Sequence, residues 1–92
     1  MAYSVGIIGG GSWGTAIGTQ IAQAYGKAEI YVRNRDIAEE INDRHTNTKY
    51  LPNTILSTNL IATNTLQDIC QHDIMIVAVP SNQFIEIIDI IK

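Results

Sequence analysis

A short apolar run that leads into three consecutive glycines constrains this chain more than any other feature. Residues 5–8 read Val-Gly-Ile-Ile, and Gly9, Gly11 and Gly14 follow with the spacing G-x-G-x-x-G. At this spacing the first glycine takes a backbone conformation closed to other residues, the second lets the main chain approach a diphosphate, and the third lets a helix sit close to the strand. The first N–H groups of a helix have no partner within it and lie at the positive end of its dipole. A diphosphate site is therefore predicted where a helix over 12–25 begins.

The rest of the chain alternates strands with helices, which is what a parallel sheet with crossover helices requires. A glycine-rich surface turn without a ligand is the competing interpretation of the motif. It is disfavoured because a strand precedes the glycines, a helix follows them, and a second strand comes about 20 residues on. We expect strands over 3–8, 28–33, 60–63 and 74–79, and helices over 12–25, from 34 or 36 to about 45, over 65–71 and over 82–92. This order predicts an α/β fold, the N-terminal part of a Rossmann-type doubly wound parallel sheet.

Apolar periodicity suggests which side chains form the core. In the first helix Ile17, Ile21 and Ala24 recur at helical spacing, and the small Ala16, Gly18 and Ala22 permit close approach. The unbroken apolar run over 74–79 is typical of a central parallel strand that is covered on both faces. Cys70 is expected to be a small buried helix residue without a catalytic role, since no base has a sequence reason to lie beside it. The stretch 46–59 has little periodicity and is either a functional loop or an insertion. His45 and His72 are isolated in polar stretches and are expected at the surface.

Composition narrows the class of partner. Ninety-two residues make one domain at most, and a net charge of −3 with scattered Lys and Arg residues provides no basic surface for nucleic acid. No apolar segment is long enough for a membrane span or a signal peptide, so a cytoplasmic location is expected. Charged residues make up only 16% of the chain, which suggests that part of its surface faces protein and is compatible with a homodimer. The single cysteine excludes an internal disulfide and a cysteine metal cluster.

The end of the second predicted strand bears on the choice of cofactor. It reads Val32-Arg33-Asn34-Arg35, and Arg33 stands about where an acid would hold the ribose 2′-hydroxyl of NAD. A guanidinium can pair with a 2′-phosphate through two hydrogen bonds, so NADP is favoured. NAD stays possible, because Asp36 could serve as a displaced ribose acceptor and the two arginines could be solvated charges.

Several motifs, taken together and in order, resemble one family. They are Gly-Gly-Gly-Ser-Trp-Gly-Thr-Ala over 9–16, Arg-Asn over 33–34, Glu-Glu-Ile-Asn over 39–42, Tyr-Leu-Pro over 50–52 and Ala-Val-Pro-Ser over 78–81. With these motifs nearly the whole chain resembles the N-terminal portion of bacterial-type NAD(P)-dependent glycerol-3-phosphate dehydrogenase. The resemblance implies an oxidoreductase that interconverts dihydroxyacetone phosphate and sn-glycerol 3-phosphate and supplies phospholipid synthesis.

The resemblance also implies roles for individual residues. Ser12 and Trp13 would line the pyrophosphate and nicotinamide side, and Arg33 would contact the adenine-ribose end. Tyr50 and Phe84 are weaker candidates for the cofactor pocket, because aromatic side chains of this kind also serve as packing residues. Pro80 follows the last predicted strand and should border the cofactor, since ligands of such sheets lie beyond the carboxyl ends of the strands. Ile85 departs from the family, whose bacterial members often have an arginine there.

No catalytic or metal-binding residue is expected within the chain. The family's catalytic lysines and its helical C-terminal substrate domain would lie beyond Lys92, so residues 1–92 would be a partial NAD(P)-binding domain that is inactive alone. Two other interpretations stay open. One is a related NADP-dependent reductase, of the ketopantoate reductase or sugar-nucleotide dehydrogenase type. The other is a nucleotide-sensing module without chemistry, although such modules usually retain an acid at the ribose position.

Overall fold

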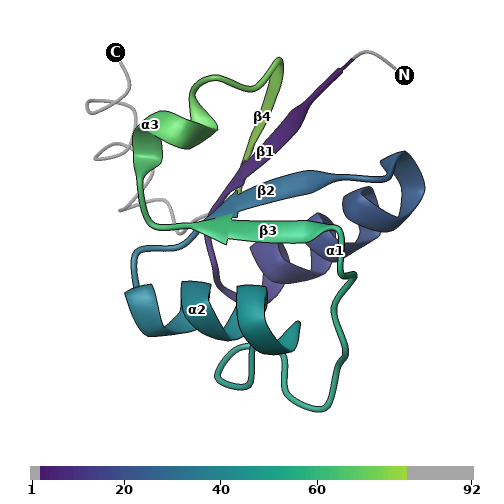
Figure 1. Cartoon of the computed structure of the whole chain (residues 1–92), viewed down its shortest axis with the longest axis vertical. Coiled ribbons are helices and arrows are strands. Elements are labelled where there is room, and N and C mark those ends of the chain that lie inside the picture. Colours follow the sequence, from purple (N-terminus) through teal and green to yellow (C-terminus); the bar gives the residue numbers. More distant parts are fainter. Residues whose placement is uncertain (1–2, 79–92) are drawn as a thin grey trace.

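A parallel sheet forms the centre of the molecule. The structure, a computed structural model, describes residues 3–78 of the chain. The strands are β1 (Val5–Ile8), β2 (Ala28–Tyr31), β3 (Leu60–Thr63) and β4 (Ile74–Val77), and they pair in parallel in the order β3-β2-β1-β4 (Figure 1). The chain moves outward from β1 to β3 and then crosses back to the other side of β1. This reversal of direction beside β1 is the hallmark of a doubly wound sheet.

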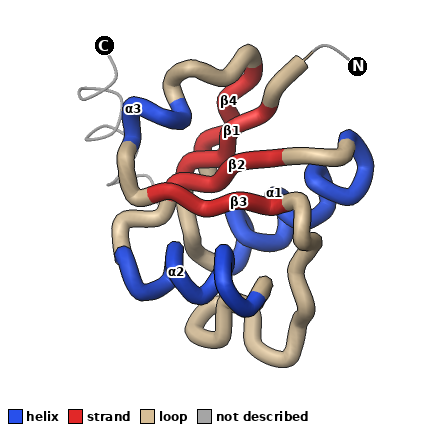
Figure 2. The backbone as a smooth tube through the Cα atoms, viewed as in Figure 1, coloured by secondary structure: helices blue, strands red, loops and turns tan. Residues whose placement is uncertain are grey.

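Helices cover both faces of the sheet. They are α1 (Ser12–Tyr25), α2 (Arg35–Arg44) and the short α3 (Leu66–Ile69). Successive residues of a strand point to opposite faces, so Ile7 packs in the core with Ile41 of α2, whereas the neighbouring Ile8 packs with Ile69 of α3. Figure 2 shows α1 and α2 on one side of the strands and α3 on the other. The predicted α/β fold is thus confirmed, with helices in two layers around one sheet.

The face of α1 that lies on the sheet is built from small side chains. Its buried residues are Gly14, Thr15, Gly18, Thr19 and Ala22. Gly18 and Ala22 thus permit the close approach that was expected, while Ile17 and Ile21 are only partly buried and Ala24 is exposed. The reason is the distance between helix and sheet, since a Cβ atom on Gly18 would already lie 3.1 Å from Leu60 Cδ1. Branched side chains along this face would hold the helix away from the strands.

Other predicted elements are shorter than the sequence pattern indicates. The helix expected over 65–71 is only the four residues of α3, and Cys70 is exposed at its C-terminal end, so its predicted burial was wrong. β4 is the edge strand of the sheet that the structure describes, and Ile74 and Met75 are 45% and 40% exposed there. Within residues 3–78, the cover on both faces that its apolar run predicts is thus missing. The helix expected over 82–92 lies outside the described residues.

Neither histidine is the surface residue that was expected. His45 ends α2 in a left-handed conformation with a φ of 58°, and its side chain is half-buried. His72 Nε2 lies 2.7 Å from Glu29 Oε1 of β2, and its ring lies over Gly6, where an added Cβ would come within 2.9 Å of His72 Cδ2. Both side chains are thus partly buried, and the Nδ1 atom of each has no hydrogen-bond partner among the described residues. None of the helices described is long and apolar enough to cross a membrane.

Candidate functional site

The turn between β1 and α1 has a geometry that only glycine allows at two positions. Gly9 has a φ of 127°, a region that side chains rarely adopt, and its N–H donates to the Tyr31 carbonyl of β2 at 3.1 Å. A Cβ atom on Gly14 would lie 1.7 Å from the Gly9 carbonyl oxygen. Both glycines have the conformational roles that the spacing predicts, and together they bring the start of α1 directly against the end of β1.

The start of α1 offers unpaired main-chain donors. The first helical hydrogen bond is from Thr15 N–H to the Gly11 carbonyl, at 3.0 Å, and no side chain caps this end of the helix. Among the residues described, none accepts a hydrogen bond from the N–H groups of Gly11, Ser12 or Trp13. Apart from Gly11 and its two chain neighbours, no atom of the described residues lies within 4 Å of a Cβ placed on Gly11. The turn therefore presents amides and the positive end of a helix dipole to open space, the arrangement that binds phosphate groups.

The side chains of Ser12 and Trp13 face different surroundings. The Ser12 hydroxyl donates to the Tyr50 carbonyl at 2.6 Å, so it is tied to the loop rather than aimed at the open space. The Trp13 indole is 79% exposed. Tyr50 thus reaches the turn through its main chain, while its own ring is 38% exposed and lies 5.2 Å from the Lys49 ammonium. Of the predicted cofactor residues, these three gather at the N-terminus of α1.

The loop over 46–59 folds back onto the glycine turn. Its most buried polar residue is Asn47, which has no exposed surface. Its side-chain Nδ2 donates to the Gly10 carbonyl at 3.0 Å and to the Thr15 hydroxyl at 2.9 Å, while that hydroxyl donates to the same carbonyl at 3.3 Å. Sequence reasoning missed Asn47 because an asparagine in a polar loop is normally exposed. No periodic signal in the loop marks it, and its two hydrogen bonds join the loop to the glycine turn and to α1.

A carboxylate of α2 organises the same loop. Glu40 Oε2 accepts hydrogen bonds from the Thr46 hydroxyl at 2.6 Å and from the Thr48 N–H at 3.0 Å, and also from the Thr48 hydroxyl. These bonds lower the pKa of Glu40 below its ordinary value; burial opposes the change, and the charge of Arg44 adds a smaller lowering effect. The attraction between Glu40 and Arg44 is thus minor, and the main partners of the carboxylate are the two threonines.

Arg33 lies at the same edge of the sheet as the glycine turn. It follows the buried Val32 at the end of β2, and a Cβ atom on Gly10 would come within 2.1 Å of Val32 Cγ1. The turn and the residue before Arg33 are therefore in direct contact. Asn34, rather than Asp36, caps α2 by accepting from the N–H groups of Asp36 and Ile37, at 2.8 Å and 3.3 Å. Arg33 itself is exposed, as a contact with a solvent-facing 2′-phosphate requires.

Most of the predicted cofactor residues come together at one edge of the sheet. Gly9, Gly11, Ser12, Trp13, Gly14, Arg33 and Tyr50 all lie at or next to the carboxyl ends of β1 and β2. Pro80 and Phe84 lie outside the described residues. The site therefore has the location that ligands take in sheets of this topology, beside the point where strand order reverses.

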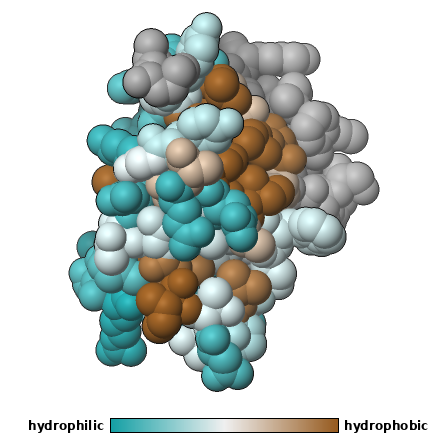
Figure 3. Space-filling model, turned by 90° about the vertical axis from the view of Figure 1, so that its right-hand side faces the viewer, coloured by the Kyte–Doolittle hydropathy of each residue, from teal (hydrophilic) through white to brown (hydrophobic). Residues whose placement is uncertain are grey.

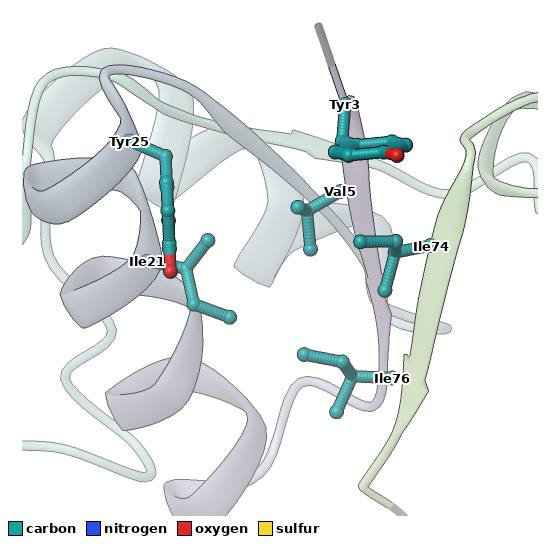
Figure 4. Close-up of a pocket in the computed structure, with 6 residues that line it drawn as sticks. All are labelled: Tyr3, Val5, Ile21, Tyr25, Ile74 and Ile76. Carbon is teal, nitrogen blue, oxygen red and sulfur yellow. The ribbon is translucent and has the colours of Figure 1, made fainter. Parts of the chain in front are cut away.

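An apolar pocket lies toward the amino ends of the strands, at the other end from the glycine turn. It is lined by residues from the amino ends of β1 and β4 and the last turns of α1 (Figure 4), namely Tyr3, Val5, Ile21, Tyr25, Ile74 and Ile76. Some of these side chains belong to the exposed apolar surface of the molecule, part of which is visible in Figure 3. The pocket has no charged group and does not reach the glycine turn, so it is no candidate for a diphosphate.

The fold and the site define the class of protein. A parallel sheet with reversed strand order, a glycine turn against its central strand and open amides at a helix start are the features of a Rossmann-type dinucleotide-binding domain. Residues 4–92 match the family model described as the N-terminus of NAD-dependent glycerol-3-phosphate dehydrogenase, and the chain belongs to this family. The resemblance seen in the sequence motifs is thereby confirmed.

Curated relatives agree with this assignment. The chain is 44% identical over 79 residues to the glycerol-3-phosphate dehydrogenase (NAD(P)+) of Orientia tsutsugamushi, covering 86% of this chain and 24% of the relative. It is 40% identical over 89 residues to the protein of the same name from Rickettsia bellii, covering 97% of this chain and 28% of the relative. The chain thus spans about a quarter of the length of these relatives.

Solved structures show the same architecture. The glycerol-3-phosphate dehydrogenase of Saccharomyces cerevisiae matches with a TM-score of 0.88 at 29% identity, over 100% of this chain and 30% of that one. The enzyme from Coxiella burnetii matches with a TM-score of 0.83 at 30% identity, over 94% of this chain and 27% of that one. Both therefore share the fold described here within a much longer chain.

Two glycines of the turn should respond differently to the same added methyl group. Gly14→Ala places a Cβ 1.7 Å from the Gly9 carbonyl oxygen, a steric clash that should lower the free energy of unfolding by about 3 kcal/mol or more. Gly11→Ala has open space and an ordinary φ of −77°, so it should cost less than about 1 kcal/mol. Urea unfolding followed by circular dichroism measures both. Equal losses in the two variants would contradict the close packing inferred for Gly14.

Glu40 should make the stability of the chain depend on pH in a defined direction. Since its pKa is lowered in the folded state, its stabilising effect is fully present above the ordinary glutamate pKa and is lost as the pH falls through the lower folded value. Glu40→Gln should therefore unfold more easily than the parent chain at pH 7, and the difference should shrink below about pH 4. Thermal unfolding of both proteins between pH 3 and pH 7 (roughly the range over which carboxylates titrate) tests this. A difference that is constant across that range would show that ionisation of Glu40 is not involved.

Proposed function

We propose that this chain is the N-terminal dinucleotide-binding part of an enzyme that interconverts dihydroxyacetone phosphate and sn-glycerol 3-phosphate, feeding phospholipid synthesis. The observation that supports it most is the set of open N–H groups of Gly11, Ser12 and Trp13 at the start of α1, in a chain of this family. These donors would hold the linked phosphates of the cofactor. Gly9 and Gly14 would act indirectly, by bringing the turn and the helix into place.

The reaction needs more than this chain contains. The bound nicotinamide cofactor would supply the hydride to the carbonyl carbon, and a proton donor must supply a proton to the carbonyl oxygen. In the described part of the chain, no acid or base stands beside the open space at Gly11, so we propose no catalytic residue here. We propose that the lysines and the helical substrate domain belong to further residues of a longer protein. The relatives, of which this chain covers 24% and 28%, are long enough to contain them.

NADP is the cofactor we favour, with NAD as the alternative. Arg33 is exposed two residues beyond β2 and next to Val32, which contacts the glycine turn. A guanidinium at this place can pair with the 2′-phosphate of the adenine ribose, which NAD lacks. Asp36 is exposed in the first turn of α2 and could accept from a ribose hydroxyl. We further propose that Trp13 and Tyr50, and Pro80 and Phe84 outside the described residues, border the rest of the cofactor.

The partner that we propose is a small phosphorylated molecule in the cytoplasm. A net charge of −3 with scattered basic residues gives no support to a nucleic acid partner. A homodimer is compatible with the exposed Tyr3, Ile74 and Met75, which leave apolar surface for a second copy or for the rest of a longer protein. The family match favours this function over a ketopantoate reductase, a sugar-nucleotide dehydrogenase or a nucleotide-sensing module.

A hybrid enzyme tests the function. Residues 4–92 would replace the matching segment of the Rickettsia bellii relative, and NADPH oxidation would be followed with dihydroxyacetone phosphate, with ketopantoate and without substrate. We expect turnover with dihydroxyacetone phosphate only, and none by residues 1–92 alone, in which we propose no catalytic residue. A second hybrid with Gly14→Ala controls for the glycine turn and should be inactive. Tight NADPH binding and dihydroxyacetone phosphate reduction by the isolated chain would contradict the division of roles.

Arg33 should decide between the two cofactors. Arg33→Ala should weaken NADPH binding about tenfold, the loss of one charge-assisted contact, and leave NADH binding within about twofold. Arg35→Ala is the matched control, because Arg35 is also exposed but pairs with Glu39 at 3.3 Å on the surface of α2. Quenching of Trp13, the only tryptophan, measures both affinities. Equal losses for NADPH and NADH in Arg33→Ala would remove the argument for NADP.

A further inference from the structure

One polar side chain of the long loop is buried against the glycine turn rather than exposed. Asn47 has no accessible surface, and its Nδ2 lies 3.0 Å from the Gly10 carbonyl oxygen and 2.9 Å from the Thr15 hydroxyl. Its Oδ1 accepts from the Tyr50 N–H at 3.4 Å, and its own carbonyl accepts from the Leu51 N–H at 2.8 Å. Burying an amide is unfavourable unless it is hydrogen-bonded, and here both ends of the amide have partners.

These bonds fix the orientation of one peptide group in the turn. The chain has no cis peptide among the residues described, so the carbonyl of Gly10 and the N–H of Gly11 point in opposite directions across their shared plane. The carbonyl is held inward by two donors, the Asn47 amide and the Thr15 hydroxyl. The Gly11 N–H must then point away from the Asn47 amide, and none of the described residues accepts a hydrogen bond from it. Glycines at 9, 10 and 11 would otherwise allow this peptide to rotate easily.

We propose that Asn47 is a positioning residue for the cofactor, because it holds the Gly10–Gly11 peptide with its N–H directed at the diphosphate. This inference rests on the proposed function, since it needs a diphosphate at the turn. The loop would then affect binding although the side-chain amide of Asn47 does not contact the ligand. The energetic basis is preorganisation: an amide that already points at the phosphate has no orientational entropy to lose on binding.

The loop itself is held at both sides of Asn47. On one side Glu40 of α2 accepts from Thr46 and Thr48, and on the other the Tyr50 carbonyl accepts from Ser12 at 2.6 Å. Asn47 therefore cannot follow a movement of the glycine turn without breaking bonds to α1 or α2. The loop acts as a fixed support that connects the second helix to the first turn of α1.

A matched asparagine exists elsewhere in the fold. Asn42 of α2 also makes two amide hydrogen bonds to backbone, donating to the Ala62 carbonyl at 2.9 Å and accepting from the Ala62 N–H at 2.8 Å. These bonds join α2 to β3 and do not involve the glycine turn. Asn42 is exposed whereas Asn47 is buried, but removal of either amide breaks two hydrogen bonds to the rest of the fold, and only the loss of Asn47 should affect the ligand.

The test is a titration of the isotope-labelled full chain, with NADPH and with inorganic pyrophosphate, followed by the amide resonances in NMR spectra. In the parent chain we expect the Gly11 amide to shift with both ligands. Asn47→Ala and Asn47→Asp should weaken binding about tenfold and should move the Gly11 resonance even without ligand, because aspartate cannot donate to the carbonyl. Asn42→Ala should bind as the parent does. NMR detects millimolar affinities, so weak binding by the chain still gives a result.

The possible outcomes separate this inference from the proposed function. If the parent chain gives no response at Gly11 with either ligand, the diphosphate site is wrong and the inference fails with it. If the parent responds and both Asn47 variants bind equally well, only the positioning role is wrong. If those variants do not fold, Thr15→Val, which has the same shape but no hydroxyl, removes one of the two donors to Gly10. It should weaken binding about threefold, and parent-like binding by this variant would overturn the inference.

Discussion

The close approach of α1 to β1 is the constraint on which the rest of the structure depends. It is set where Gly14 meets the Gly9 carbonyl, a contact that leaves no room for a side chain. Because the helix starts so close to the sheet, the whole inner face of α1 must be small, and its buried residues are glycines, threonines and an alanine. The same contact places the helix N-terminus at the carboxyl edge of the central strand. The contact between Gly14 and Gly9 thus determines both the small residues on the inner face of α1 and the position of its N-terminal amides.

A second consequence follows for the loop that joins α2 to β3. A turn made of three glycines has little conformational preference of its own, so its shape has to come from its neighbours. Val32 lies against Gly10 from the end of β2, and Asn47 holds the Gly10 carbonyl from the loop. Both contacts come from residues that are distant in sequence from the glycines. The turn is therefore rigid only in the folded domain, which ties cofactor binding to the integrity of the sheet.

Much of the fold could be predicted from the sequence because strand and helix order depends on local pattern. The four strands and the first two helices lie where apolar runs and turn residues indicate them, and Gly9 and Gly14 have conformations that their spacing alone implies. Burial of individual side chains was harder to predict, because contacts between residues distant in sequence determine it. Ile17 and Ile21 have helical spacing but are only partly buried, and the short distance between helix and sheet places Thr15 and Thr19 on the inner face beside the small residues. Asn47 could not be found, since nothing in its neighbours indicates that it is buried.

The two ends of the parallel strands differ in chemistry: polar groups gather at the carboxyl ends and apolar side chains at the amino ends. At the carboxyl ends of the strands, the amides that begin α1 have no acceptor among the described residues and Arg33 is exposed, an arrangement suited to a charged ligand. At the amino ends, Tyr3, Tyr25 and Ile74 surround an apolar pocket that has no charge to attract a phosphate. The strands between them run in parallel, so every helix that follows a strand starts at the first end and every strand starts at the second. Parallel topology therefore gathers the helix starts at the carboxyl ends of the strands, where Asn34 caps the first amides of α2 and those of α1 have no acceptor among the described residues.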